Sequence, residues 1–212
     1  MSRQRVAYHH GSLAQALIAE ATDQVRERGS DAVSLRGVAE RIGVSPSAAY
    51  NHFPDKNALM QAVADRGAEI LDEAMTVGFH EADEIADPDL AARQRLLFLG
   101  RAYAGFATTE PHLFRHTFGP WCANPTEDMH AENAGYQLLC TALDDLDARG
   151  LLRPGCRDGL DLVMWTAIHG FSYLVLEGYL PFESGQLILE SIQRLAFADQ
   201  VTTANVWARQ PA

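Results

Sequence analysis

Residues 34–53 read SLRGVAERIGVSPSAAYNHF, and this stretch decides the fold. Apolar residues recur on one helical face of its first part: Leu35, Val38, Ala39 and Ile42. Ser34 precedes that face as a helix cap, and Gly43 can supply the left-handed residue that ends the helix. Pro46 stands at the first position of a second short helix, with Ser45 as its cap. The pattern therefore predicts two short helices around a tight turn.

This arrangement is the layout of a DNA-binding helix-turn-helix. The second helix presents small or polar side chains that can enter a major groove: Ser45, Ser47, Ala48 and Asn51. Asparagine suits a pair of hydrogen bonds to adenine. The stretch therefore indicates a protein that binds double-stranded DNA.

Residues 10–60 resemble the N-terminal signature of the TetR family of transcriptional regulators. The resemblance rests on SLRxVA at residues 34–39 and GVSx5NHFPxKxxL at residues 43–59. It implies phosphate contacts from Tyr50, His52 and Lys56. It also implies a helical body that forms a two-fold dimer and holds an inducer.

The predicted DNA-contacting residues are Ser34, Arg36, Ser45, Ser47, Ala48, Tyr50, Asn51, His52 and Lys56. Asn51 stands where many family members have a basic residue, which changes the contact expected there. Arg3 and Arg5 can add minor-groove or backbone contacts, as basic arms do. Tyr50 and Phe53 also fit a core aromatic role, which we favour for Phe53 only, and His52 also fits a solvated surface histidine.

The charge distribution is compatible with a DNA partner despite a formal net charge of −11. Residues 1–60 hold seven basic and six acidic side chains, a net charge of +1, so the remainder carries −12. An acidic body keeps the molecule off DNA except where the near-neutral N-terminal part approaches first. No secretory leader, membrane-spanning run or CxxC pair is present in the sequence, so we expect a soluble, cytoplasmic protein.

Helical spacing continues along the whole chain, and we expect an all-α fold. In the first part of the chain, we predict helices at residues 12–28, 35–42 and 46–53 and one from 55 to past 75, followed by a loop at 78–88. In the second part, one helix carries Leu96 to Phe106 and another ends at Gly150. The remaining predicted helices cover residues 111–118, 158–178 and 184–198. We place a three-helix DNA-binding domain at 1–54 and a ligand-binding and dimerisation domain at 55–212. The helix at 158–178 is apolar nearly all round, which favours a four-helix interface with a second copy.

The body contains candidate ligand-binding residues: Tyr103, Phe106, Phe114, Phe118, Trp121, Trp165 and His169. The same residue types fill ordinary cores, and that alternative stays open. The WxxxHG motif at residues 165–170 resembles the body of one TetR subgroup. His112 and His116 have a spacing that can hold a metal, with Cys122 as a further donor, but we favour a polar or pocket-lining role and expect no metal or cofactor.

Taken together, the pattern predicts a repressor that a small-molecule effector releases from a palindromic operator, by moving the fourth helix and so the two DNA-binding domains. One rival is an enzyme that uses His169 with Glu177 or Asp161, although no catalytic motif supports it. Another is a helical binding protein that does not bind DNA.

Overall fold

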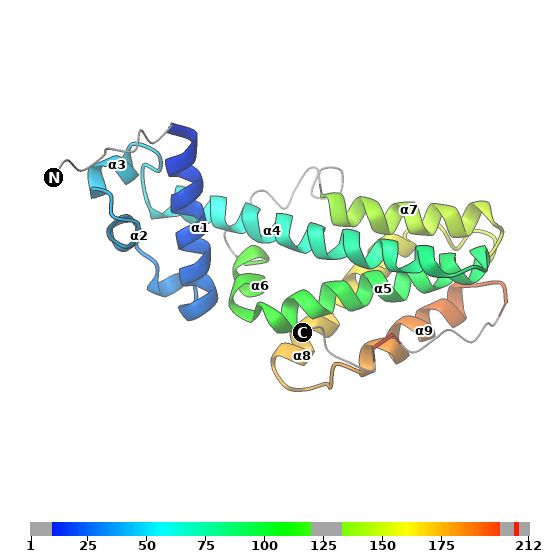
Figure 1. Ribbon diagram of the computed structural model, residues 1–212. Helices are drawn as coiled ribbons and strands as arrows, with labels where there is room; N and C mark the ends of the chain where they lie inside the picture. Colours follow the sequence, from blue (N-terminus) through cyan, green and yellow to red (C-terminus); the bar gives the residue numbers. More distant parts are fainter. Residues whose placement is uncertain (1–9, 120–132, 200–205, 208–212) are drawn as a thin grey trace. The chain divides into compact units, whose positions relative to one another are not determined.

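The computed structural model describes residues 10–119, 133–199 and 206–207, and its regular elements are helices (Figure 1). The helices are α1 (His10–Arg28), α2 (Leu35–Arg41), α3 (Pro46–Tyr50), α4 (Lys56–Glu81), α5 (Pro88–Thr109), α6 (Pro111–Thr117), α7 (Ala134–Ala148), α8 (Leu160–Leu176) and α9 (Ser184–Ala196), with short 3-10 turns η1 (Ser30–Ala32) and η2 (Ala82–Glu84). The all-α prediction is confirmed.

The capping signals around α2 and α3 act as the sequence predicts. The hydroxyl oxygen of Ser34 accepts from the Gly37 amide at 3.1 Å, and that of Ser45 accepts from the Ala48 amide at 3.2 Å. Gly43 has a φ of 76°, the left-handed conformation that turns the chain between the two helices. Local chemistry therefore fixes both ends of the turn.

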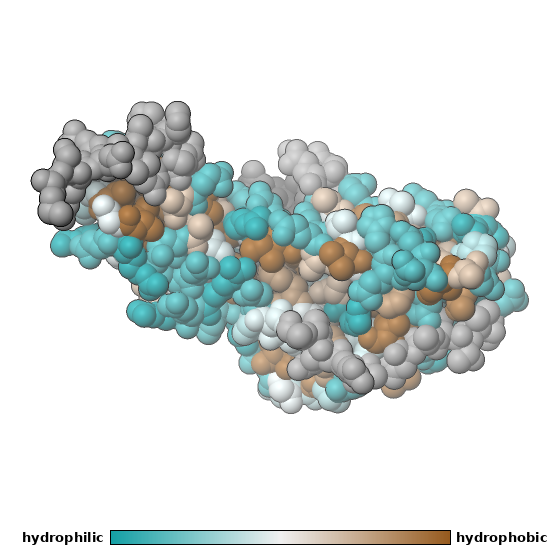
Figure 2. Space-filling model, viewed as in Figure 1, coloured by the Kyte–Doolittle hydropathy of each residue, from teal (hydrophilic) through white to brown (hydrophobic). Residues whose placement is uncertain are grey.

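The described chain packs into two compact units. Residues 1–68 and 112–123 make up the first unit, and residues 69–111 and 124–212 make up the second. In the first unit α1 contacts η1, α2 and α3, and in the second α5 contacts α7, α8 and α9. Apolar side chains reach the surface at several places among hydrophilic ones on the face shown in Figure 2. The boundary at residues 54 and 55 remains a functional prediction, and α4 runs through both units.

The predicted loop at residues 78–88 is wrong over its first half, because α4 continues to Glu81. Gly78 is a contact and not a turn: a Cβ atom there would lie 2.9 Å from the Ala102 Cβ and 3.0 Å from the Phe98 carbonyl oxygen of α5. Glycine thus allows α4 and α5 to approach closely. Arg101 then pairs with Glu81 at 2.6 Å and secures the end of α4.

Several predicted helix ends also move, and α8 covers Leu160–Leu176 instead of 158–178. α1 begins at His10, two residues before Ser12, and α9 ends at Ala196, where Phe197 turns to form an antiparallel bridge with Leu152. α3 ends at Tyr50 instead of Phe53, because the amides of residues 52 and 53 both bond to the Ala49 carbonyl in a tighter turn. None of the helices in the described ranges is long and apolar enough to cross a membrane.

α6 belongs to the first unit through contacts with α4. The Nε2 atom of His116 lies 2.9 Å from the Met60 carbonyl oxygen, and the imidazole is only 2% exposed. A methyl group at Gly67 would overlap the Thr117 hydroxyl, so glycine lets α6 sit directly on α4. Burial lowers the pKa of His116 below its ordinary value of 6.5, since burial disfavours the charged imidazolium.

This buried histidine predicts an acid sensitivity of the first unit. As pH falls through 6.5, the unfolded chain binds a proton at His116 that the folded chain does not bind. The free energy of unfolding therefore falls, by up to about 1.4 kcal/mol per pH unit from this group. We expect His116→Gln to reduce the decline measured by urea unfolding between pH 7 and pH 5.

The exposed His112, one turn earlier on α6, provides the matched control. His112→Gln should leave the pH dependence of the unfolding free energy as in the wild type. Parallel curves for His116→Gln and wild type would show that His116 titrates alike in both states.

Candidate nucleic-acid interface

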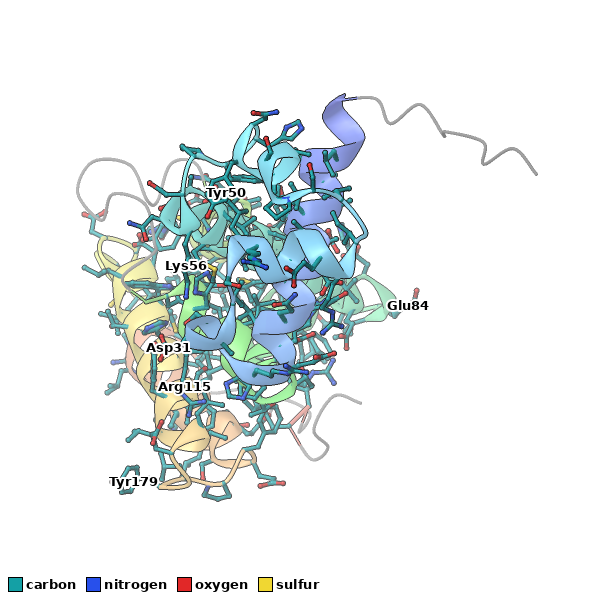
Figure 3. The ribbon with its side chains drawn as sticks, turned by 90° about the vertical axis from the view of Figure 1, so that its left-hand side faces the viewer. Asp31, Tyr50, Lys56, Glu84, Arg115 and Tyr179 are labelled. Atoms are coloured by element: carbon teal, nitrogen blue, oxygen red, sulfur yellow. The ribbon has the colours of Figure 1, made fainter. Side chains whose placement is uncertain are left out.

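α3 has one buried side and one side turned to solvent. Ala49 is fully buried and Phe53, just beyond the helix, is 9% exposed, so the core role for Phe53 holds. Ser47 and Asn51 are exposed, and the Tyr50 side chain is 51% exposed for a large aromatic residue. Figure 3 shows Tyr50 at the α3 part of the first unit. An exposed tyrosine in this position suits a partner and not the core.

The remaining predicted positions of the first unit also lie at its surface. Ser34 and Ser45 are exposed while their hydroxyl oxygens serve as caps, and Ala48 and His52 are half-buried. A capping hydroxyl accepts through its oxygen and keeps its own proton as a donor. The geometry therefore lets one side chain support the helix and contact a partner.

The four arginines of α1 and α2 are engaged with nearby carboxylates. Arg36 donates from Nε to Glu40 at 2.8 Å, with the two side chains 76% and 57% exposed. Further pairs join Arg26 to Asp23, Arg28 to Glu27, and Arg41 to Glu20 and Glu27. Exposed pairs of this kind are screened by water and contribute little to stability, so a phosphate can displace a carboxylate at little cost.

Lys56 has a structural role that the sequence did not reveal. Its ammonium donates to the Ser30 carbonyl at 3.0 Å and lies 3.5 Å from the Asp31 carbonyl, so the first residue of α4 holds η1 in place. An ammonium carries three donors, and these two contacts leave one for another acceptor. No periodic pattern marks such a long-range contact to backbone carbonyls.

Tyr103, Trp165 and His169, three of the candidate ligand residues, meet in the second unit. The Tyr103 hydroxyl lies 2.7 Å from His169 Nδ1, and Trp165 stacks on His169 with ring centroids 5.4 Å apart. Tyr173, one turn further along α8, packs edge-on against His169 at 5.1 Å and was not predicted. Residues 165, 169 and 173 are four apart on one helix, and this spacing is the sequence signal that could have identified Tyr173.

Burial sets the protonation of this aromatic cluster. It raises the pKa of Tyr103 well above its ordinary value and lowers that of His169, so the phenol is protonated and the imidazole neutral near pH 7. The Tyr103 hydroxyl and His169 Nδ1 share one hydrogen bond, in which the neutral imidazole can accept through Nδ1 or donate from it.

The structure describes three of the other four candidate ligand residues. Phe106 is buried on α5 in the second unit. Phe114 and Phe118 belong to the first unit, where their rings pack 4.9 Å apart. Trp121 lies outside the described residues, as do Cys122, Arg3 and Arg5. The spacing of these aromatics along the chain could not separate the two units, since the packing of α6 on α4 depends on long-range contacts.

An acidic hollow on the second unit was not foreseen. Its volume is about 450 Å³, and its lining includes Glu69, Asp72, Glu73 and Thr76 on one face of α4. Asp72 accepts from the Gly135 amide at 2.8 Å, and burial raises the pKa of its carboxyl group.

Within the described ranges, no group of three His, Cys, Asp or Glu residues could hold a metal ion. His112 is exposed and His116 buried, although they share α6.

Comparison with known proteins agrees with this geometry. Residues 17–63 match a family model described as bacterial regulatory proteins of the tetR family, and residues 96–196 match one described as a Tetracyclin repressor-like C-terminal domain. An uncharacterized HTH-type transcriptional regulator of Bacillus subtilis is 24% identical over 181 residues, covering 85% of this chain and 87% of that protein.

Solved structures share the fold along most of the chain. A protein with unknown function from Rhodococcus sp. RHA1 is 29% identical, with a TM-score of 0.73 over 90% of this chain and 98% of that one. A TetR family transcription regulator from Marinobacter aquaeolei VT8 is 21% identical, with a TM-score of 0.58 over 87% of this chain and 95% of that one. The helix-turn-helix geometry and both family matches lead to one conclusion: the chain belongs to the TetR family of DNA-binding transcriptional regulators.

Proposed function

We propose that this regulator is a homodimeric repressor of a roughly palindromic operator and that a small-molecule effector releases it from DNA. The observation that carries the proposal is α3, whose buried side is fixed by Ala49 and Phe53 while Tyr50 and Asn51 face solvent. Two such helices in a dimer enter successive major grooves about 34 Å apart. The operator then mirrors the two-fold axis of the protein.

The contacts divide into those that read bases and those that position the protein. Ser47 and Asn51 suit hydrogen bonds to base edges, and Ala48 suits contact with a thymine methyl group. Tyr50, His52 and the third donor of Lys56 suit phosphate oxygens, and so do the hydroxyls of the capping residues Ser34 and Ser45. Arg36 reaches a phosphate once it leaves Glu40. Residues 1–54 thus serve as the DNA-binding domain.

The dimer interface is supported by apolar side chains that the single chain leaves exposed on α8 and α9. Leu162, Val163 and Leu174 of α8 are 43–51% exposed, and Leu187 and Leu195 of α9 are 62% and 73% exposed. Leaving such side chains in water forgoes roughly 1.5–3 kcal/mol for each one that burial would cover. Pairing α8 and α9 with those of a second copy covers them in a four-helix interface.

The effector site is best supported at Tyr103, Trp165 and His169. The two rings of α8 offer a stacking surface and the imidazole is neutral near pH 7, so the fitting ligand is planar. Residues 55–212 then bind ligand and dimerise. Differential binding of the effector to two positions of α4 changes DNA affinity. We infer a cytoplasmic regulator without catalytic activity.

Selection of bound sequences from random duplex DNA tests the proposal directly. The purified wild type should enrich a palindrome, and Tyr50→Ala should enrich none or enrich it weakly. Recovery of a non-palindromic consensus would contradict the dimer, and absence of any consensus at low salt would contradict this operator model. The enriched duplex then serves for ligand screening by loss of binding.

Tyr50 and Lys56 should differ in what their loss does. Tyr50→Phe removes a hydrogen bond to phosphate from an exposed ring, so DNA affinity should fall by roughly tenfold for two domains while Tm stays unchanged. Lys56→Met also removes the bonds to η1, so it should lower both Tm and the salt dependence of binding. Fluorescence anisotropy at several salt concentrations and thermal unfolding measure both. A Tm loss in Tyr50→Phe would assign Tyr50 to the core.

Removal of the Glu40 carboxylate should strengthen DNA binding. Glu40→Gln frees Arg36 from its ion pair and removes a negative charge beside the DNA, so affinity should rise by about 2- to 5-fold for each half-site. Glu84→Gln, an exposed change in the second unit, gives the same change in net charge as a control. Equal effects of the two variants would mean that only net charge matters and that Arg36 does not contact DNA.

Leu195 should support the dimer without supporting the fold of the single chain. Leu195→Glu places a charge in the proposed interface, so sedimentation should show dimerisation weakened by at least about tenfold, with secondary structure retained. Val77→Glu is the matched control, because Val77 is 66% exposed and lies on α4 instead of α8 or α9. A dimer that survives Leu195→Glu would place the interface elsewhere.

A further inference from the structure

Residues 206 and 207 lie in the second unit, and the Trp207 side chain is buried there. Trp207 is 0% exposed and is the largest fully buried side chain in the described part of the chain. Its ring lies 4.9 Å from the Phe182 ring and 5.7 Å from the Phe171 ring, measured between centroids. Aromatic neighbours thus line the indole on two sides.

Two glycines complete the space around the indole. A methyl group at Gly185 of α9 would overlap the six-membered ring of Trp207, and one at Gly100 of α5 would lie 3.4 Å from its Cζ2 atom. The same methyl group at Gly100 would meet Leu189 and Ile168. Helices α5, α8 and α9 therefore border a space that holds the indole, and glycine at residue 185 is what leaves room for its six-membered ring.

The indole and its walls are held by different interactions. Residues 206 and 207 lie outside helices, and beyond ring contacts they are linked by the Val206 amide to Gln186 Oε1 at 3.2 Å and by Arg101 to the Val206 carbonyl at 3.5 Å. The walls have links of their own. The Gln193 side chain of α9 donates to the Arg93 carbonyl of α5 at 3.1 Å. The space can thus persist when the indole leaves it.

We propose that the second unit contains a binding site for a planar aromatic ring of indole size, which Trp207 of the same chain fills. An indole-type ligand takes this site when the tryptophan side chain is absent. Apolar cavities lined by packed side chains stay open and bind aromatic molecules, because the surrounding structure relaxes only in part. This site is separate from the proposed effector cluster, whose rings are those of Tyr103, Trp165 and His169.

Occupancy of the ring site also bears on the proposed dimer. α9 presents Gly185, Gln186 and Leu189 to the inside, and Leu187 and Leu195 to the outside. A ring behind the helix therefore fixes the position of the apolar side chains in front of it. This consequence rests on the proposed α8–α9 interface, whereas the ring site itself does not.

Rescue by free indole tests the site. Trp207→Gly should lower Tm by on the order of 10 °C, since a large buried aromatic side chain is lost. Indole at about tenfold its Kd should then raise the Tm of Trp207→Gly by roughly 3–6 °C, as binding to the folded state alone requires. Wild type is the matched control and should show no rise, because its site is filled. Protein concentration is held constant throughout.

Saturable binding of indole to Trp207→Gly, measured by calorimetry, supports the site. No saturable binding to the folded variant, or an equal Tm rise in wild type, overturns it. Trp207→Phe fills the site in part and should respond less than Trp207→Gly.

A double-mutant cycle keeps the proposal testable if Trp207→Gly does not fold. Gly185→Ala in the wild type should lower Tm, because the added methyl group meets the indole. In the Trp207→Phe background the same change should cost less, since the smaller ring leaves room. Equal Tm losses in both backgrounds overturn the contact and with it the ring site.

Sedimentation separates this inference from the proposed dimer. With Trp207→Gly, indole should restore both Tm and dimerisation. If indole raises Tm while the wild type itself is monomeric, the ring site holds and the proposed dimer fails. If the wild type is dimeric and indole has no effect on the variant, the ring site fails and the dimer holds.

Discussion

A five-residue helix cannot maintain itself in water, and DNA recognition by this protein depends on what holds α3 in place. Helix nucleation costs more than one turn of hydrogen bonds returns, so isolated helices of this length do not form. The Ser45 cap satisfies an amide of the first turn, and Gly43 sets the direction in which the chain enters it. Burial of Ala49 and Phe53 supplies the remaining stability. These buried contacts hold α3 in place, and they therefore also fix the positions of its exposed side chains.

The attraction between this protein and DNA phosphates depends on how its few cationic side chains are paired. The four arginines of α1 and α2 are in ion pairs, and the Lys56 ammonium contacts backbone carbonyls. The long-range attraction to phosphate is therefore weak, in a protein of net charge −11. Close hydrogen bonds from uncharged donors must then carry much of the binding. Such contacts form only at a matching surface, so the charge pattern favours selectivity over tight non-specific binding.

Signals that act within a few residues made most of the fold predictable. Caps at Ser34 and Ser45, the turn at Gly43 and the apolar stripes located nearly every helix before the structure was known. The loop predicted at residues 78–88 begins too early, because a glycine that ends a helix and one that lets two helices touch look alike in sequence. The difference lies in Ala102 and Phe98 of another helix, which no local pattern reveals.

The candidate sites could be predicted only in part, because their geometry depends on contacts between residues far apart in the sequence. The spacing of Trp165 and His169 placed them on one face, but their meeting with Tyr103 depends on how α5 packs against α8. His116 and His169 are both partly or wholly buried histidines with lowered pKa, yet one bonds to a backbone carbonyl and the other to a phenol. A carbonyl accepts a hydrogen bond from Nε2–H whether or not the imidazole is protonated, so the first contact supports α6 against α4. The second contact joins α5 to α8 through the Tyr103 hydroxyl.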